Sequence, residues 1–436
     1  MDSTLTRPGT VSPVDFSWRR NAFLAMVAVL PLHTVVLERW ISWKPFLLLL
    51  IALVVADARD GVSERRWPWH GPTSVALAVF FVSVAVSYPG ADSDARYLRL
   101  LLAIGVGGAV LLVTHKALGD RGMMDRTLRT VFWSGAAVGA TAVFLSLVAL
   151  GTLGDTMLAK IEDIPLVFRV AKAGFLESGF VSLTNWHNDP GFSAQWMNLW
   201  AALAFVAALR GLGSRWQWVN AAVVGSLAFG SIMTFSRTGW LGLVVATAAA
   251  AWVMKREQSD WQPALRLLSG AVAVAALLIV GAAVVDGDGG GDLSEMFSFR
   301  FEQAFSLGTA AEESVGFEEA DFRSVYWPKY VDFFQEDPLL GAGLGAGVST
   351  GLQDPHNLGL ELLGETGLVG TIGFAGLLTV LVLWGSGPIG WLAVAITYSA
   401  AVTQTILFEP AWWFAAALLL AGDKRRRSRV TSADDA

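Results

Sequence analysis

Residues 264–284 read ALRLLSGAVAVAALLIVGAAV, and Arg266 is the one charged side chain in this stretch. At 1.5 Å per residue, a helix of this length is about 30 Å long, which matches the hydrocarbon thickness of a bilayer. Membrane-spanning backbone is either helical or part of a closed barrel, and barrel strands alternate apolar and polar residues, which this run does not. The stretch therefore predicts a transmembrane helix.

Similar apolar runs recur along the chain from residue 20 to residue 422. Hydrophobic residues make up 54% of the 436 residues and charged residues only 16%, whereas soluble domains carry roughly 25% charged residues. We therefore predict an all-α polytopic membrane protein and exclude a porin-like barrel. The chain has no cysteine, which excludes disulfides, thiolate metal sites and a cysteine nucleophile. Its net charge of -6 argues against a nucleic acid partner.

The runs predict about twelve transmembrane helices, an even number that places both termini on one side. The expected ranges are 20–37, 45–58, 72–89, 97–115, 130–152, 192–210, 216–235, 238–254, 264–284, 366–384, 387–405 and 410–422. Residues 222–254 could instead form a single helix that is broken at 236–239. That alternative would put the basic cluster at 424–429 outside the cell, which the charge distribution disfavours.

The charged residues indicate which side is cytoplasmic. With a cytoplasmic N-terminus, twenty of the 31 basic residues and twelve of the 37 acidic residues lie inside, so the inner face carries +8 and the outer face -14. This agrees with the excess of Lys and Arg in cytoplasmic loops of membrane proteins. The expected organisation is a cytoplasmic tail at 1–19, helices over 20–284 with an external segment at 153–191, an external loop at 285–365, helices over 366–422 and a cytoplasmic tail at 423–436.

The external loop 285–365 is strongly acidic, with sixteen acidic residues and three basic ones. Its Gly/Asp-rich start at 286–292 predicts a flexible turn. Amphipathic helices are expected near 294–306 and 320–336. The cations of this loop, Arg300, Arg323 and Lys329, therefore stand in a negative environment.

Two arginines are candidates for binding an anion on the outer face. Arg323 lies in the acidic loop, where it either pairs with a neighbouring carboxylate or contacts a phosphate, which the arginine fork suits. Arg237 lies at the outer end of the seventh predicted helix, in a turn with almost no loop. An interfacial side chain that reaches toward lipid headgroups is the alternative for Arg237.

The predicted topology places His187 and His356 in external segments. A single loop histidine is often incidental, but a neutral imidazole with an ordinary pKa of about 6.5 can accept a proton from a sugar hydroxyl. His187 and Asp189 form at most a weak metal pair, and they could instead line the entrance for an acceptor.

The spacing of Gly341, Gly343, Gly345 and Gly347 invites comparison with a nucleotide-binding loop. We reject that interpretation, because no strand precedes the glycines, no Lys-Ser/Thr pair follows them, and ATP is absent on the outer face. The glycines are better explained by tight turns or by close approach of the backbone to a lipid-linked ligand.

Residues 319–374 carry a pattern that resembles the O-antigen ligase and polymerase family of bacterial envelope glycan enzymes. The pattern consists of Arg323-x-x-x-Trp327, then Asp337-Pro-Leu-Leu-Gly341-x-Gly-x-Gly345, His356-Asn357 and Glu361-Leu-Leu-Gly-Glu365-Thr-Gly-Leu-Val-Gly370. Ser236-Arg237-Thr238-Gly239 matches a second signature of the family, an arginine at the outer end of an earlier helix. The rest of the chain is similar only in hydropathy and helix count.

The resemblance implies a multi-pass enzyme of the bacterial inner membrane with the GT-C-like architecture and a periplasmic active site. Such enzymes transfer a glycan from undecaprenyl diphosphate to the lipid A core or to another lipid-linked glycan, with inversion and without a metal or other cofactor. By resemblance, Arg237 and Arg323 would hold the diphosphate and His356 would act as the base. The residues expected to bind substrate are Arg300, Trp327, Asn357, Glu365, His187 and Asp189.

Within the family we favour a ligase, and a polymerase of O-antigen or exopolysaccharide is the nearest alternative. A twelve-helix secondary transporter is the alternative from another class. Transporters of that size usually have two six-helix halves and charged residues within their helices. Here the longest soluble segment follows the ninth predicted helix, and charged residues within the predicted helices are nearly absent. A purely structural membrane protein would leave the arginine and histidine positions unexplained.

Overall fold

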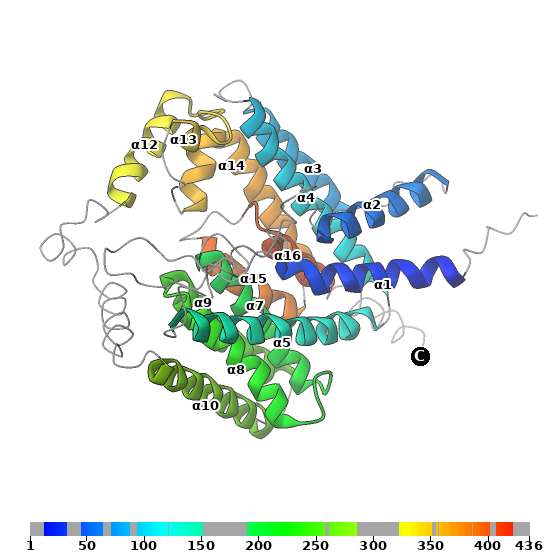
Figure 1. Ribbon diagram of the computed structural model, residues 1–436. Coiled ribbons are helices and arrows are strands. Elements are labelled where there is room, and N and C mark those ends of the chain that lie inside the picture. The colour runs from blue at the N-terminus through cyan, green and yellow to red at the C-terminus, as the bar shows by residue number, and fades with distance from the viewer. Residues whose placement is uncertain are drawn as a thin grey trace, which may run out of the picture.

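The computed structural model describes residues 13–32, 45–63, 71–87, 94–120, 122–150, 190–257, 261–285, 322–350, 355, 357–385, 387–401 and 407–421. All regular structure within these ranges is helical (Figure 1), as the sequence predicts. The predicted helix at 294–306, the turn at 286–292 and the tail at 423–436 lie outside the described residues. The helices are α1 (Pro13–Val29), η1 (Leu30–Leu32), α2 (Pro45–Ser63), α3 (Pro72–Ala85), α4 (Asp94–Leu118), α5 (Met123–Leu150), α7 (Pro190–Leu209), α8 (Gln217–Met233), α9 (Arg237–Glu257), α10 (Gln262–Val285), α12 (Phe322–Glu336), α13 (Ala346–Ser349), α14 (Leu358–Trp384), α15 (Pro388–Ala401) and α16 (Pro410–Ala421).

Each of the twelve predicted helical ranges overlaps one described helix, and α12 confirms the helix predicted near 320–336. The prediction was wrong at three helix starts. α1 begins at Pro13 and not at residue 20, α5 begins at Met123 and not at residue 130, and α14 begins at Leu358, eight residues before the predicted start at 366. Hydropathy missed the start of α14 because its first two turns contain Glu361 and Glu365, which made them resemble part of the loop.

The alternative of one broken helix over 222–254 is wrong, because the chain reverses direction between α8 and α9. The indole Nε1 of Trp240 on α9 donates to the carbonyl of Ile232 on α8 at 3.3 Å. In a continuous helix these two residues would be about 12 Å apart along the axis. The two helices therefore form a hairpin.

Five helical segments in the described part of the chain are long and apolar enough to cross a membrane. They are Tyr97–Leu118, Met123–Leu147, Gly191–Leu209, Gln262–Val284 and Leu358–Trp384. Five further apolar helices of 10–17 residues accompany them. These helices are consistent with a polytopic membrane protein, and the count of twelve spans stays a prediction.

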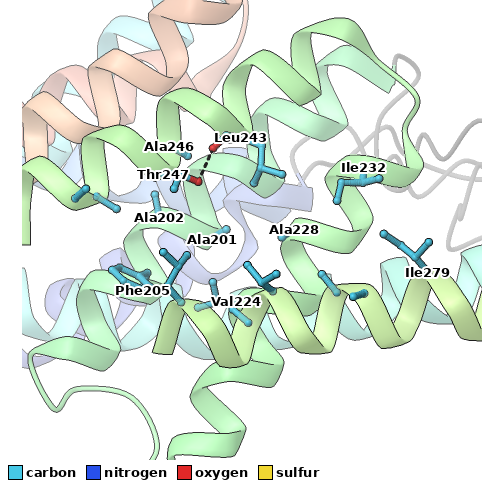
Figure 2. Close-up of a pocket in the computed structure, with 17 residues that line it drawn as sticks. Ala201, Ala202, Phe205, Val224, Ala228, Ile232, Leu243, Ala246, Thr247 and Ile279 are labelled. Carbon is cyan, nitrogen blue, oxygen red and sulfur yellow. Dashed lines mark hydrogen bonds between the residues drawn. The ribbon is translucent and has the colours of Figure 1, made fainter. Parts of the chain in front are cut away.

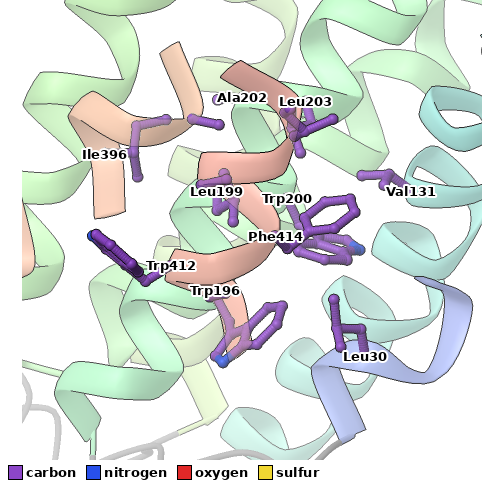
Figure 3. Close-up of a cluster of buried hydrophobic side chains, with 14 of the residues drawn as sticks. Leu30, Val131, Trp196, Leu199, Trp200, Ala202, Leu203, Ile396, Trp412 and Phe414 are labelled. Atoms are coloured by element: carbon purple, nitrogen blue, oxygen red, sulfur yellow. The ribbon is translucent and has the colours of Figure 1, made fainter. Parts of the chain in front are cut away.

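The core is built around α7 and α16. All residues of α16 are buried, as expected for a helix that is apolar around its whole circumference. Figure 3 shows Trp196 and Trp200 of α7 close to Phe414 of α16, with 5.8 Å between the ring centroids of Trp200 and Phe414. At 12 residues α16 is about 18 Å long, which is shorter than the hydrocarbon layer of ~30 Å.

Ion pairs within the described residues join side chains at or near the ends of predicted helices that the topology assigns to the cytoplasmic face. Arg19 pairs with Asp60 and, at 4.0 Å, with Asp57; Lys116 also pairs with Asp57, and Arg210 pairs with Asp125. The hydrogen bond from the Arg19 guanidinium lowers the pKa of Asp60 below its ordinary value. The contacts are compatible with the assignment of these residues to a single face.

The long helix α14 is interrupted at Gly367, whose φ of 59° and ψ of -160° are not helical. The interruption removes helical partners from the carbonyls of Gly364 and Glu365, three and two residues earlier. These carbonyls instead accept hydrogen bonds from the amides of Ala342 and Gly343, each at 2.9 Å. A loop from outside the helix thus replaces two of its hydrogen bonds.

The same loop also satisfies the two amides that follow the interruption. Leu368 N donates to the carbonyl of Pro338 at 2.9 Å, and Val369 N donates to the carbonyl of Leu339 at 3.1 Å. An ideal helix would have paired these amides with the carbonyls of residues 364 and 365. The loop therefore replaces the helical partners of two carbonyls before the interruption and of two amides after it.

We predict that Gly367→Ala destabilises the protein by about 3 kcal/mol or more. A Cβ at Gly367 would lie 2.4 Å from the carbonyl oxygen of Leu339, and the backbone conformation is accessible mainly to glycine. The control is Gly376→Ala on the same helix, where an added Cβ meets nothing within 4 Å. Thermal unfolding in detergent should give a lower midpoint for the first variant and an unchanged or higher midpoint for the second. Equal midpoints would contradict the inserted-loop geometry.

Candidate functional site

The turn between α8 and α9 positions Arg237 at the first residue of α9. Phe235, two residues earlier, has a φ of 50° and is the only non-glycine residue with positive φ among those described. Thr234 stabilises the turn, because its hydroxyl donates to the carbonyl of Ser231 at 2.7 Å and accepts from the amide of Ser236 at 3.3 Å. Backbone strain of this kind is common at functional sites.

The helix α12 carries Arg323 at its second residue and Trp327 one turn later, so both residues share a face of the helix. The indole Nε1 of Trp327 donates to the carbonyl of Pro355 at 2.9 Å. Pro355 directly precedes His356 in the chain. Trp327 therefore connects the helix of Arg323 to the backbone next to the predicted base.

Glu365 is buried, with 2% of its surface exposed, and its carboxylate contacts the glycine-rich loop. Its two oxygens accept hydrogen bonds from Gly345 N at 2.7 Å and from Gly347 N at 3.1 Å. Hydrogen bonds to an ionised acceptor are about twice as strong as neutral ones. Glu365 thus fixes the loop that leads toward His356, and its predicted contact with substrate stays a prediction.

Tyr330 of α12 fills the space between the loop and α14, and it is 1% exposed. A Cβ at Gly347 would lie 1.9 Å from the Tyr330 hydroxyl, and a Cβ at Gly364 would lie 2.8 Å from the Tyr330 carbonyl. Glycine is therefore required at 347 for α12 to pack against α13, and at 364 for α12 to pack against α14. Of the two explanations predicted for the glycine series at 341–347, the tight turns are observed, since three of its four glycines have positive φ. Close approach to a lipid-linked ligand stays a prediction.

Asn357 begins α14 as its N-cap, since its side-chain oxygen accepts a hydrogen bond from Leu360 N at 3.0 Å. Capping by Asn is worth about 1 kcal/mol. His356 itself lies outside the described residues. The residues on either side of it are held in place: Trp327 donates a hydrogen bond to the carbonyl of Pro355, and Asn357 accepts one from Leu360 N at the start of α14.

An apolar cavity of about 300 Å³ lies between α7, α8, α9 and α10 (Figure 2). The hydroxyl of Thr247 in its wall donates to the carbonyl of Leu243 at 2.8 Å, within α9. Ile232 and Leu243 line the cavity and lie within six residues of Arg237 in the sequence. A cavity of this size and composition is suited to a hydrocarbon chain.

A comparison with known protein families identifies one part of the chain. Residues 221–375 match the O-antigen ligase family. The resemblance predicted from the motifs is thereby confirmed over this range, which is just over a third of the chain. A search of curated proteins found no match.

The O-antigen ligase match extends from α8 into α14 and contains both helices on which the candidate arginines lie. Of the predicted site residues it includes Arg237, Arg300, Arg323, Trp327, His356, Asn357 and Glu365. His187 and Asp189 precede it. Four of the predicted residues, Arg300, His356, His187 and Asp189, and the side chains of Arg237 and Arg323 lie outside the described part of the structure.

Of the residues predicted to bind substrate, Trp327 and Asn357 hold the chain on the two sides of His356, whereas Glu365 contacts Gly345 and Gly347 of the glycine-rich loop. Sequence reasoning missed Tyr330, because an aromatic residue in an amphipathic helix gives no signal of which neighbour it packs against. It also missed the apolar cavity, since alanine-rich helices look alike whether they meet closely or leave a gap.

We predict that Glu365→Ala increases amide hydrogen exchange at Gly345 and Gly347 by roughly 10- to 100-fold, because two buried amides lose a charged acceptor. Glu365→Gln should give a smaller increase, since one oxygen acceptor remains. Glu336→Ala, at an exposed position of α12, serves as the control. Exchange measured by mass spectrometry on the peptide that covers 341–350 tests this. Unchanged protection in Glu365→Ala would contradict the anchoring role.

Proposed function

We propose that this protein transfers a glycan from undecaprenyl diphosphate to a sugar hydroxyl at the periplasmic face of a bacterial inner membrane, as an O-antigen ligase with the lipid A core as acceptor. The proposal rests on the O-antigen ligase match over residues 221–375, which includes both candidate arginines and the candidate base. The apolar helices of the described chain support a membrane location.

In the proposed reaction, the acceptor hydroxyl oxygen attacks the anomeric carbon of the first sugar of the donor. A new carbon–oxygen bond forms on one face while the bond to the diphosphate breaks on the other, so the configuration is inverted. The hydroxyl proton passes to a base, and undecaprenyl diphosphate leaves with the bonding electron pair. The energy of the donor linkage drives transfer.

Arg237 and Arg323 are proposed to stabilise the charge that develops on the leaving diphosphate. A guanidinium group can form two parallel hydrogen bonds to phosphate oxygens and stays protonated at any physiological pH. Charge stabilisation of this kind is often the largest single contribution to catalysis. Their positions at the first turns of α9 and α12 place each arginine at the end of a rigid element.

His356 is proposed as the base that accepts the proton from the acceptor hydroxyl. An imidazole with its ordinary pKa of about 6.5 is largely neutral at neutral pH and can therefore accept a proton. The bonds that hold Pro355 and Asn357 support this role, because a base must be held within hydrogen-bonding reach of the hydroxyl. Arg300, Trp327, Asn357, Glu365, His187 and Asp189 are proposed to shape the substrate site, either by contact or by holding the loop.

The apolar cavity beside α9 supports a lipid-linked donor. Its walls come from α7, α8, α9 and α10, and Arg237 begins one of these helices, α9. A hydrocarbon chain in this cavity would leave its diphosphate near the outer end of α9. We propose that part of the donor lipid lies there.

We predict that Arg237→Ala and Arg323→Ala each lower transfer by at least 100-fold, because a donor of transition-state hydrogen bonds is lost. His356→Ala should lower transfer by at least about 100-fold across pH 6–8, because the general base is lost. The measurement is transfer from undecaprenyl-diphosphate oligosaccharide by purified protein in lipid vesicles over pH 6–8. If either arginine variant transfers glycan at the wild-type rate, that arginine does not stabilise the leaving diphosphate.

We predict that Ala246→Phe raises the KM for the lipid-linked donor about 10-fold, because the larger side chain fills part of the apolar cavity. The control is Val244→Phe on the same helix, which is 67% exposed and lies outside the cavity lining. Donor saturation curves at fixed acceptor concentration test this. An equal KM for the two variants would show that the cavity does not hold the donor lipid.

The choice between ligase and polymerase is decided by acceptor competition. The reconstituted protein is offered donor together with equal amounts of lipid A core and a second lipid-linked glycan. Transfer to the lipid A core is the result expected for a ligase, and growth of the lipid-linked glycan would identify a polymerase. Movement of the lipid-linked glycan across the vesicle membrane, without transfer of the glycan to either acceptor, would support the transporter alternative.

A further inference from the structure

Asn198 lies in the middle of α7 and is completely buried, with 0% of its surface exposed. Its side-chain Nδ2 donates to the carbonyl of Gly239, in the first turn of α9, at 2.8 Å. In an 18-residue window of the segment Gly191–Leu209 of α7, 83% of the residues are buried, so this amide lies in the packed centre of the protein. A buried side chain of α7 therefore holds the start of the helix that Arg237 begins.

The two helices approach closely because glycines line the contact. A Cβ at Gly239 would lie 2.6 Å from the Cβ of Ala194, and a Cβ at Gly242 would lie 2.6 Å from Nδ2 of Asn198. Small residues permit such approach between membrane helices and make their contacts tight. α9 therefore packs closely against α7 at these two positions.

Arg237 precedes Gly239 by two residues, which is about 3 Å along the helix axis. On its other side the strained turn at Phe235 connects it to α8. The backbone of Arg237 is thus held from both directions, by the hydrogen bond of Asn198 on one side and by the turn on the other.

We propose that Asn198 is a positioning residue for Arg237, which sets the place of that arginine against the diphosphate of the lipid-linked donor. The inference rests on the proposed function, because it takes Arg237 as a contact to the diphosphate. Misplacement of a charged contact by about 1 Å can lower its effect by up to 100-fold.

The chain offers a matched control one turn earlier on the same helix. Gln195 is 2% exposed, and its Nε2 donates to the carbonyl of Thr397 on α15 at 3.2 Å. The side-chain oxygens of Gln195 and Asn198 both lack a partner within the described residues. The two amides therefore have the same burial and the same kind of bond, but only the bond of Asn198 reaches the helix of Arg237.

The experiment compares Asn198→Leu with Gln195→Met in the full-length protein in lipid vesicles. Both substitutions remove one buried amide and its unpaired oxygen and keep a similar volume. The measured quantities are the dissociation constants for undecaprenyl diphosphate and for undecaprenyl monophosphate, together with the thermal midpoint. We expect Asn198→Leu to weaken diphosphate binding by between about 10- and 100-fold with little change for the monophosphate, and Gln195→Met to leave the ratio of the two constants unchanged.

Epistasis with Arg237 separates positioning from a general structural role. In an Arg237→Ala background, Asn198→Leu should cause no further loss of diphosphate affinity. Equal effects of Asn198→Leu and Gln195→Met, or an unchanged ratio of the two constants, would overturn the inference and leave the proposed function standing. Wild-type diphosphate affinity in Arg237→Ala would overturn the diphosphate contact itself. Should Asn198→Leu lower the yield of folded protein, Asn198→Ser serves for the same measurements.

Discussion

The arrangement of α12, α13 and α14 depends on four backbone groups that the break at Gly367 releases from helical pairing. Unpaired backbone groups cost several kcal/mol each where water is excluded. The loop at 338–343 satisfies all four, two carbonyls with its amides and two amides with its carbonyls. The loop must therefore lie along α14, and α12, which directly precedes it, is brought against the same helix. The contact of Glu365 with Gly345 and Gly347 follows from that placement.

The two arginines proposed for chemistry lie in the first turns of helices that contacts with neighbouring helices hold in place. α9 is held against α7 by glycines and by Asn198, so the first residue of α9 has a defined place. α12 is held against α14 through Tyr330 and against the chain before His356 through Trp327. Rigid elements of this kind position functional side chains more accurately than loops do. The contact of α9 with α7 and the contact of α12 with its neighbours both involve close approach at glycine. This explains why glycines recur in the signatures that carry the family resemblance.

Much of the helical framework could be predicted, because the length of an apolar run and the thickness of a bilayer are directly comparable. The turn that ends α8 and begins α9 at Arg237 was predicted for the same reason. The start of α14 was not, since Glu361 and Glu365 lie in its first two turns and looked like loop residues. Glu365 also appeared to be available for substrate, and its observed hydrogen bonds are with the amides of its own chain.

The sequence by itself determined the helical class, the approximate helix ranges and the residues able to bind a phosphate or accept a proton. These follow from composition, from spacing along the chain and from the chemistry of single side chains. Only the tertiary structure decided which residues hold the others in place. Asn198 contacts Gly239 across 41 positions of sequence, and Trp327 contacts Pro355 across 28. Such pairs depend on how helices pack, and packing is set by the shapes of surfaces that are distant in the sequence and leave no periodic signal in it.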